Sequence, residues 1–386
     1  MSATEPARKQ RDLRLDVFRG LALVMIFINH TPGTIYENFT TRNFGFSDAA
    51  EGFVLMSGIA AGLAYGKFFA TPARPWTGVA KIWRRVWTLY QVHIVTTIIA
   101  LGIAAATAYF LGEFTAMQKN AIRFQWQMPL QFLIGIPLLT HQIGYANILP
   151  LYAVLLFVAP LTLAAGHRWP RLTLGLAIGL WLAAAMIYFN MPNFPMKGGW
   201  FFNPFSWNLI FTIGLLTGLA YRQGRRFVPV RWWLLVPAIG WLLFALACQL
   251  FKPVSDAFGH SLYLLGEAMP VHWIFTAFDK TFLGLPRLSH ALALAYVLSA
   301  FPAIRRACGH RLARPFALLG RNGLAVFGLG VVLCYSANGI KLAAAPSLWL
   351  DTLLIGGGIA LMFLLAWSKE AWGRAETRES RPEPLV

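Results

Sequence analysis

An arginine and a histidine lie within the first membrane-length apolar segment of the chain, LDVFRGLALVMIFINH. Arg19 and His30 are eleven residues apart, so on a helix they lie on nearly the same face, roughly 16 Å apart along the axis. Ionisable groups inside a bilayer are energetically costly, and they usually face an internal cavity where they have a function. The pair therefore indicates a reaction or transport path inside a helical bundle.

Two carboxylates follow at the start of the second apolar segment, SDAAEGFVLMSGIAAGLAYG. Asp48 and Glu51 are three residues apart, so both can face one side of the helix start, at the depth of His30. A carboxylate beside a histidine sets its tautomer and stabilises its protonated form, as a general base requires. We therefore predict that His30 is a catalytic base oriented by Glu51 or Asp48. The alternative is that both acidic residues cap the helix.

Basic residues gather near the start of the third apolar segment, AKIWRRVWTLYQVH. Arg84 and Arg85 could bind phosphate, because guanidinium groups match phosphate oxygens, or could be ordinary cytoplasmic anchors. Arg321, at the inner end of a later segment, could join them. Arg19 is a candidate partner for an acyl carboxylate, and its alternative is a structural pair with Asp16.

Aromatic and amide side chains are frequent in the longer loops and at the helix starts beside them. Aromatic stacking with amide hydrogen bonds suits sugars, but the same residue types also form interfacial belts and polar contacts between membrane helices. The candidates for a glycan site are Asn147, Tyr152, Asn203 and Trp207.

Membrane-spanning helices must position these residues. A chain of 386 residues that is 57% hydrophobic and only 12% charged is not an ordinary soluble domain. Apolar stretches near 20 residues recur, which predicts an all-α integral membrane protein of about ten spans. The predicted spans are 14–33, 46–69, 78–111, 146–166, 170–190, 205–223, 231–251, 286–305, 317–341 and 347–369.

The basic residues predict the orientation of these spans. If the N-terminus is cytoplasmic, 23 of the 33 Lys and Arg residues fall on the cytoplasmic side and eight on the other. This asymmetry favours an even number of spans with both termini in the cytoplasm. The net charge of +18 therefore reflects membrane topology, and we expect no nucleic-acid partner.

The chain divides into three predicted parts. Residues 1–13 form a cytoplasmic segment, 14–369 form one transmembrane domain, and 370–386 form a cytoplasmic tail that we expect to be disordered. Gly58, Gly62 and Gly66 form a doubled GxxxG pattern, which predicts close packing against a neighbouring helix, plausibly the first. Three widely spaced cysteines predict neither a disulfide framework nor a metal site.

These motifs resemble the OpgC family of the membrane acyltransferase 3 superfamily. The superfamily pattern is the arginine and histidine of the first helix, here Arg19 and His30, followed by the segment GFVLMSG. Of the Arg-x-x-Arg pair that often opens the third helix, Arg85 matches the second arginine, and Ile82 stands at the first position. The narrower resemblance covers nearly the whole chain through RLDVFRGLAL, SDAAEGFVLMSG, NILPLY, NPFSWNLIF and LGRNGLAVF.

The resemblance implies a multi-pass enzyme of the bacterial inner membrane that transfers a succinyl group to glucose hydroxyls of a periplasmic glucan. His30 corresponds to the family's essential histidine. Succinyl-CoA is then a cosubstrate, with no permanently bound cofactor, and the partners are an acyl-CoA, a periplasmic glucan and membrane lipid. Two alternatives stay open: an O-acetyltransferase of another surface glycan, and a transporter of a glycan or acyl carrier. The oligomeric state is also open.

Overall fold

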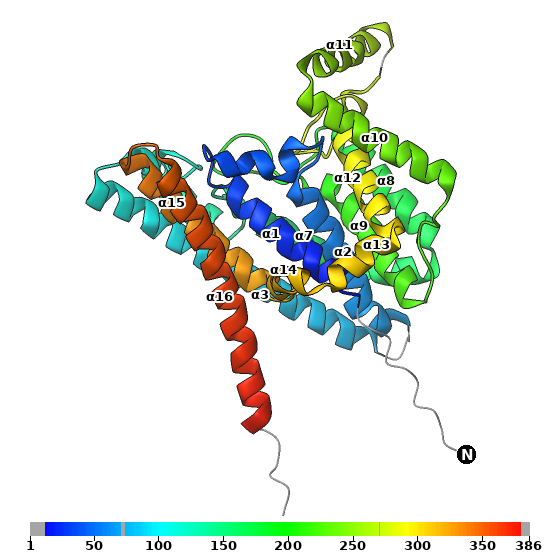
Figure 1. Cartoon of the computed structure of the whole chain (residues 1–386), viewed down its shortest axis with the longest axis horizontal. Helices are drawn as coiled ribbons and strands as arrows, with labels where there is room; N and C mark the ends of the chain where they lie inside the picture. Colours follow the sequence, from blue (N-terminus) through cyan, green and yellow to red (C-terminus); the bar gives the residue numbers. More distant parts are fainter. Residues whose placement is uncertain (1–11, 71–73, 270, 380–386) are drawn as a thin grey trace, which may run out of the picture.

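The computed structural model describes residues 12–70, 74–269 and 271–379, and in these ranges it contains helices and no β-strand. Figure 1 shows α1, α2 and α7 near the middle of the bundle, between α8, α9, α10, α12 and α13 on one side and α3, α15 and α16 on the other. The ten longest bundle helices are α1 (Arg14–Asn29), α2 (Ala49–Ala70), α3 (Pro75–Leu111), α7 (Ile148–Arg168), α8 (Pro170–Met186), α9 (Pro204–Arg222), α10 (Trp232–Leu250), α12 (Leu285–Ala300), α15 (Gly323–Ala343) and α16 (Leu348–Glu379).

Further helices connect these elements, all of them shorter except α11, which has 17 residues. They are α4 (Thr115–Gln118), α5 (Phe124–Gln127), α6 (Pro129–Gly135), α11 (Lys252–Ala268), α13 (Pro302–Gly309), α14 (Arg314–Arg321), and the 3-10 helices η1 (Ile35–Phe39), η2 (Thr41–Asn43), η3 (Trp273–Phe275) and η4 (Arg311–Ala313). We call the end of the bundle where α1 ends and α2 begins the outer end, and the opposite end the inner end. The distribution of basic residues predicts that the inner end is cytoplasmic.

Each predicted span contains a helix, so the all-α prediction is confirmed. By length and apolarity, six helices in the described ranges are able to cross a membrane: α2, α3, α7, α10, α15 and α16. A seventh span results if α12 and α13 count as one. The chain is therefore a multi-pass α-helical membrane protein, and ten crossings stay a prediction, since α1 and α8 have only 16 and 17 residues.

Two predicted spans are broken. The segment 286–305 bends by 78° between α12 and α13, because Pro302 has no N–H and forces extended backbone on Phe301, whose ψ is 120°. The segment 317–341 divides at Asn322 into α14 and α15. Short α14 packs closely on α1, where a Cβ on Gly20 would lie 1.9 Å from the Phe316 carbonyl oxygen.

The glycines of α2 pack against α9, and the prediction that their partner is the first helix is wrong. A Cβ on Gly58 would lie 2.2 Å from the Phe211 carbonyl oxygen, and one on Gly62 would lie 2.4 Å from that of Leu215. Gly214 of α9 meets α2 in the same way, at 2.2 Å from the Leu55 oxygen. Both helices therefore carry small residues at the contact, which lets their backbones approach closely.

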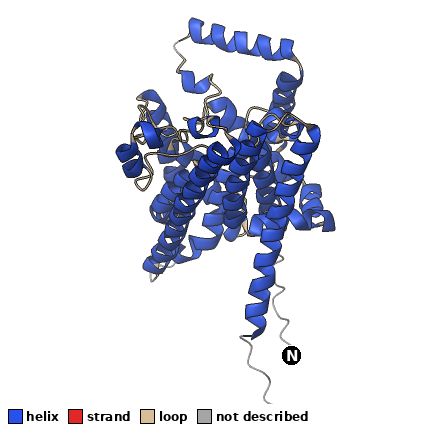
Figure 2. Ribbon diagram, turned by 90° about the vertical axis from the view of Figure 1, so that its left-hand side faces the viewer, coloured by secondary structure: helices blue, strands red, loops and turns tan. Residues whose placement is uncertain are grey.

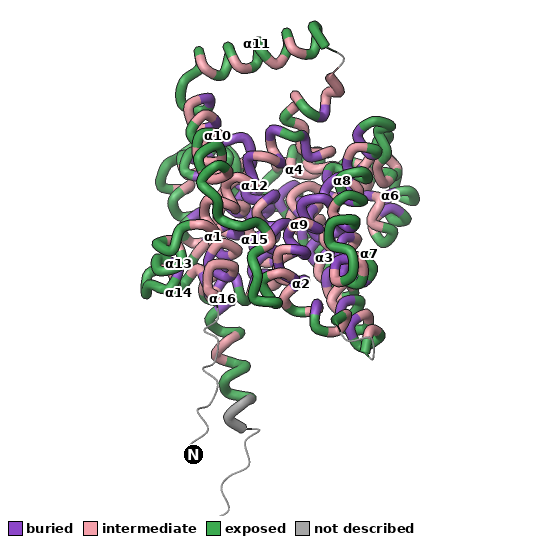
Figure 3. Tube along the Cα trace, turned by 90° about the vertical axis from the view of Figure 1, so that its right-hand side faces the viewer, coloured by how far each residue is buried: buried purple, intermediate pink, exposed green. Residues whose placement is uncertain are grey.

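Two further segments differ from what their sequence suggests. The segment 252–285, which joins the predicted spans 231–251 and 286–305, contains the helix α11, which lies across the outer end of the bundle (Figure 2) and is largely exposed (Figure 3). Residues 370–379 continue α16 as a helix and are not a disordered tail, partly because Glu370 pairs with Arg321 at 2.8 Å. The rest of the predicted tail, 380–386, lies outside the described residues, as does most of the predicted segment 1–13.

Candidate active site

His30 closes the outer end of α1. The helix ends at Asn29, and the chain turns away at Gly33, whose φ of 77° suits glycine. The His30 amide donates to the Ile26 carbonyl at 3.0 Å, and its own carbonyl accepts a 2.8 Å hydrogen bond from Asn338 Nδ2 of α15. His30 is therefore fixed between α1 and α15.

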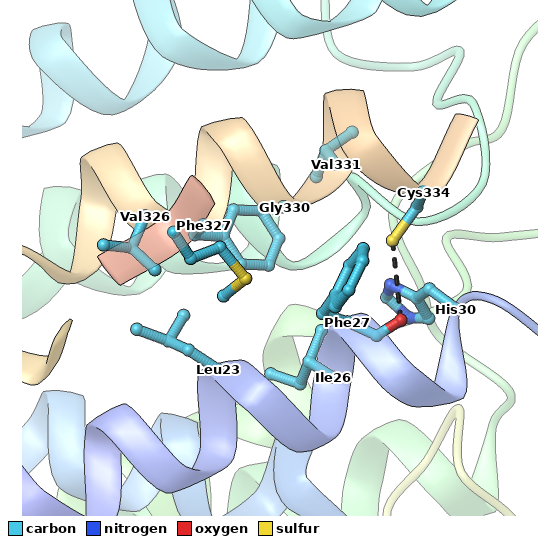
Figure 4. Close-up of a pocket in the computed structure, with 10 residues that line it drawn as sticks. Leu23, Ile26, Phe27, His30, Val326, Phe327, Gly330, Val331 and Cys334 are labelled. Carbon is cyan, nitrogen blue, oxygen red and sulfur yellow. Dashed lines mark hydrogen bonds between the residues drawn. The ribbon is translucent and has the colours of Figure 1, made fainter. Parts of the chain in front are cut away.

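A narrow apolar crevice leads from His30 toward the inner end (Figure 4). Its volume is about 10 Å³, which is room for little more than one water molecule. Because Leu23 lies two helical turns before His30, the crevice follows α1 inward. Its lining is Leu23, Ile26, Phe27 and His30 of α1, Val326, Phe327, Gly330, Val331 and Cys334 of α15, and Met362 of α16.

Tyr145 covers the outer side of His30. The two rings are 4.6 Å apart between centroids, with an interplanar angle of 34°. Tyr145 has a φ of 69°, which few non-glycine residues adopt. Its ring also meets Tyr335 edge-on at 5.5 Å, and the Tyr335 hydroxyl donates to the Gly144 carbonyl at 2.7 Å. This packing holds the ring over the histidine.

A cleft of about 620 Å³ opens on the outer side of Tyr145. Gly144 and Asn147, which lie on either side of Tyr145 in the chain, both line it, so the cleft lies close to the ring that packs on His30. The buried Oδ1 of Asn147 has no hydrogen-bond partner among the described residues. The polar side chains of the lining are mostly amides, with a few aromatic rings beside them: Asn120, Gln142, Asn147, Asn190, Asn193, Thr281, Tyr188, Trp200, Phe201 and Phe282.

Four charged side chains form a cluster near His30. Lys280 Nζ lies 2.5 Å from Asp48 Oδ2, and Arg287 Nη2 lies 3.3 Å from the same oxygen and 2.5 Å from Glu51 Oε1. Glu51 is fully buried, and its Oε2 accepts from the Asp48 amide at 3.0 Å. A buried carboxylate requires such partners. We call Asp48, Glu51, Lys280 and Arg287 the charge cluster.

The charge cluster keeps Asp48 ionised. Burial alone would raise the pKa of the Asp48 carboxyl, but the charges of Lys280 and Arg287 outweigh burial and hold that pKa well below its usual range. Burial is the largest influence on the pKa of His30 and lowers it; the charge of Lys280 acts in the same direction, and that of Asp48 opposes it.

The carboxylates do not orient His30 directly, contrary to the prediction. In the described part of the chain, no hydrogen bond joins the His30 ring to Asp48 or Glu51, because Lys280 and Arg287 engage them. The prediction missed both cations because they lie more than 200 residues further along the chain. Arg287 lies within the predicted span 286–305. A cation inside a membrane span indicates a functional group, and this was the signal in the sequence that could have identified Arg287.

A family model described as OpgC protein matches residues 11–374, nearly the whole chain. The chain belongs to the OpgC family. Membership implies an acyltransferase with a role like that of a glucan succinyltransferase. No curated protein sequence matches the chain.

In this OpgC-family protein, three of the four predicted glycan residues lie outside the cleft. Asn203 and Trp207 are fully buried: Asn203 accepts from the Phe205 amide and caps α9, and the Trp207 indole donates to the Lys280 carbonyl at 2.9 Å. Tyr152 lies on α7, with its ring 6.4 Å from Phe211. Only Asn147 lines the cleft. Trp207 instead supports the segment that carries Lys280.

The predicted donor-binding cations of this OpgC-family protein are dispersed. Arg19 donates to the carbonyls of Gly320 and Met56 at 3.5 Å each, in the inner half of α1. Arg84 is exposed and Arg85 partly buried on α3, while Arg321 pairs with Glu370. Within the described ranges, no hydrogen bond or ion pair joins any of the four to another. Ile82, at the first position of the Arg-x-x-Arg pattern, is fully buried and belongs to the core.

Proposed function

We propose that this protein transfers a succinyl group from succinyl-CoA, bound from the cytoplasm, to glucose hydroxyls of a periplasmic glucan. One observation carries the proposal: His30 lines an apolar crevice that extends inward along α1, and its ring lies against Tyr145, the residue next to Gly144 of the amide-lined outer cleft. A residue that must meet a cytoplasmic donor and a periplasmic acceptor belongs between two such spaces.

The outer cleft suits a glucan. Amide groups both donate and accept hydrogen bonds, as sugar hydroxyls do, and the exposed rings of Tyr188 and Phe201 offer flat apolar faces. Asn147 lies at the inner side of the cleft, next to Tyr145, and its buried Oδ1 is available for a sugar hydroxyl. A glucan held there presents a hydroxyl group to His30 once the Tyr145 ring, which lies over the imidazole, moves aside.

The crevice suits the thin arm of coenzyme A. Its walls are apolar side chains, which match the methylene groups of the arm. The arm is wider than the present crevice, so its entry requires side-chain movement, and flexible Met362 lines the wall that would move. Arg84, Arg85 and Arg321 are the proposed ligands of the nucleotide phosphates at the inner end.

The chemistry then needs one base. His30 takes the proton of the sugar hydroxyl as its oxygen attacks the thioester carbonyl carbon. The carbon–sulfur bond breaks, the new ester stays on the glucan, and His30 returns the proton to the departing thiolate. Burial favours the neutral imidazole that a base requires, and the charge of Lys280 acts in the same direction. The alternative route, in which His30 attacks first and forms an acyl-histidine, uses the same residue.

The test is transfer by the purified full-length protein. Incubation with succinyl-CoA and a soluble glucan should yield free CoA and a succinylated glucan, measured by thiol titration and mass spectrometry. His30→Ala should lower transfer by about 10²–10⁴-fold. The matched control is His260→Ala, an exposed histidine on α11, which should retain activity. Substantial transfer by His30→Ala, with unchanged thermal stability, would overturn the proposal.

The proposal also places the protein in the bacterial inner membrane with both chain ends in the cytoplasm. Single cysteines introduced at Arg42, at the outer end, and at Arg225, at the inner end, should react with an impermeant thiol reagent from opposite sides of the membrane. Labelling of both positions from one side would contradict this topology.

A further inference from the structure

Lys280 is the most accessible member of the charge cluster. Its side chain is 29% exposed, against 17% for Asp48, 13% for Arg287 and 0% for Glu51. An ammonium group has three N–H donors, and within ranges 12–70, 74–269 and 271–379 it has one hydrogen-bond partner, Asp48. Asp48 is itself shared with Arg287. The ammonium therefore has donors available to an incoming anion.

Lys280 lies beside the outer cleft, at the end of the bundle that holds His30. The next residue, Thr281, lines the cleft, and the Lys280 ammonium is 5.9 Å from the ring centroid of Phe201, which lines it too. The ammonium also pairs with Asp48, the residue before α2, at the outer end where His30 closes α1. An acyl chain that extends outward from His30 therefore enters the end of the bundle that holds this cation.

A donor that enters along the crevice presents its acyl group first. The acyl chain and the sulfur leave the thioester carbonyl carbon on different sides. With that carbon at His30 and the arm lying toward Leu23, the acyl chain extends outward, beyond His30. The carboxylate carbon of a succinyl group is three carbon–carbon bonds further, or ~4 Å away. Only a cation on the outer side of His30 can reach it.

Arg19 is on the wrong side for this task. It precedes His30 by eleven residues on one helix, so it lies roughly 16 Å toward the inner end. Its guanidinium is held there by the carbonyls of Gly320 and Met56. When the carbonyl carbon is at His30, a succinyl carboxylate does not reach Arg19.

We propose that Lys280 binds the terminal carboxylate of the donor's acyl group and so selects a dicarboxylic acyl thioester. The proposal rests on the proposed function and identifies the residue that determines its donor. A carboxylate that enters a partly dry site needs a charged hydrogen-bond donor, and a neutral acyl chain of the same length does not. Asp48 and Trp207 then position Lys280 by holding its ammonium and its backbone carbonyl.

The experiment compares two donors of equal chain length. The purified full-length protein is assayed with succinyl-CoA and with butyryl-CoA, which lacks the terminal carboxylate, and a soluble glucan. The readout is the ratio of kcat/KM for the two donors. Lys280→Met should lower the ratio by roughly 10- to 100-fold, the effect of one charged hydrogen bond. Lys280→Arg keeps a cation and should keep the ratio within about threefold.

Two controls separate donor selection from other effects. Arg19→Met should leave the ratio unchanged, whatever it does to the rate. If Lys280→Met does not fold, Lys280→Met combined with Asp48→Asn removes the ion pair without leaving a lone carboxylate, and the same ratio is measured. An unchanged ratio, or an equal loss with both donors, overturns the proposal. Failure of the unaltered protein to transfer either group overturns the proposed function instead.

Discussion

The imidazole of His30 and the phenol of Tyr145 lie 4.6 Å apart between ring centroids, and Tyr145 holds a left-handed backbone conformation to achieve this. Such a conformation costs about 1–3 kcal/mol for a non-glycine residue and persists where the surroundings enforce it. Here Tyr335 supplies part of that enforcement through its contacts with Tyr145 and Gly144. The ring therefore works as a cover that separates His30 from water in the cleft.

Removing this cover should uncouple the reaction. In Tyr145→Ala, water reaches His30 and competes with the glucan, so hydrolysis of succinyl-CoA without glucan should rise roughly tenfold, equivalent to ~1.4 kcal/mol. Thiol release with and without glucan measures both reactions. Tyr109→Ala, which removes an exposed ring of α3 outside the cleft lining, is the control. An unchanged ratio of hydrolysis to transfer in Tyr145→Ala would show that the ring excludes no water.

The cleft amides should act on the acceptor alone. Asn193→Ala and Gln142→Ala each remove a polar group from the cleft lining, so each should raise the KM for glucan about two- to tenfold, the effect of one hydrogen bond. The KM for succinyl-CoA should not change. Gln127→Ala, exposed on α5 and outside the cleft, serves as the control. A rise in the KM for succinyl-CoA instead would show that these amides do not bind the acceptor.

The contact between α2 and α9 should tolerate no side chain. Gly62→Ala places a Cβ where the Leu215 carbonyl oxygen lies 2.4 Å away, so the helices must separate, at a cost of about 1–3 kcal/mol. Gly102→Ala on α3 meets nothing within 4 Å and should leave stability unchanged or slightly raised. Thermal unfolding in detergent compares the two. Equal melting temperatures would mean that the helices are not in close contact.

The Lys280–Asp48 pair should stabilise the fold in a pH-dependent way. Because the folded-state pKa of Asp48 is depressed, its contribution is fully present above the unfolded pKa of about 4 and is lost as pH falls toward the folded value. Lys280→Met should therefore lower the melting temperature by a constant amount between about pH 5 and 8, and by less below about pH 4. A difference that grows in acid would contradict this sign.

Local features of the sequence predicted the helices and the position of the histidine. Long apolar runs require helices in a membrane. Proline lies in the first turn of α3, α8 and α9, where its missing N–H breaks no helical hydrogen bond. The spacing of Arg19 and His30 placed both on one face of α1, and both contact α15: Arg19 Cδ lies near Gly323, and Asn338 bonds to His30.

Only the tertiary structure decided which groups meet. Lys280 and Arg287 join Asp48 and Glu51 from more than 200 residues away, Trp207 turns inward to hold the Lys280 backbone, and the glycines of α2 select α9. The periodicity of a segment and its proline positions are set within a few turns of chain. Which helices and side chains contact one another depends instead on shape and charge over the whole bundle. No local sequence pattern contains that information.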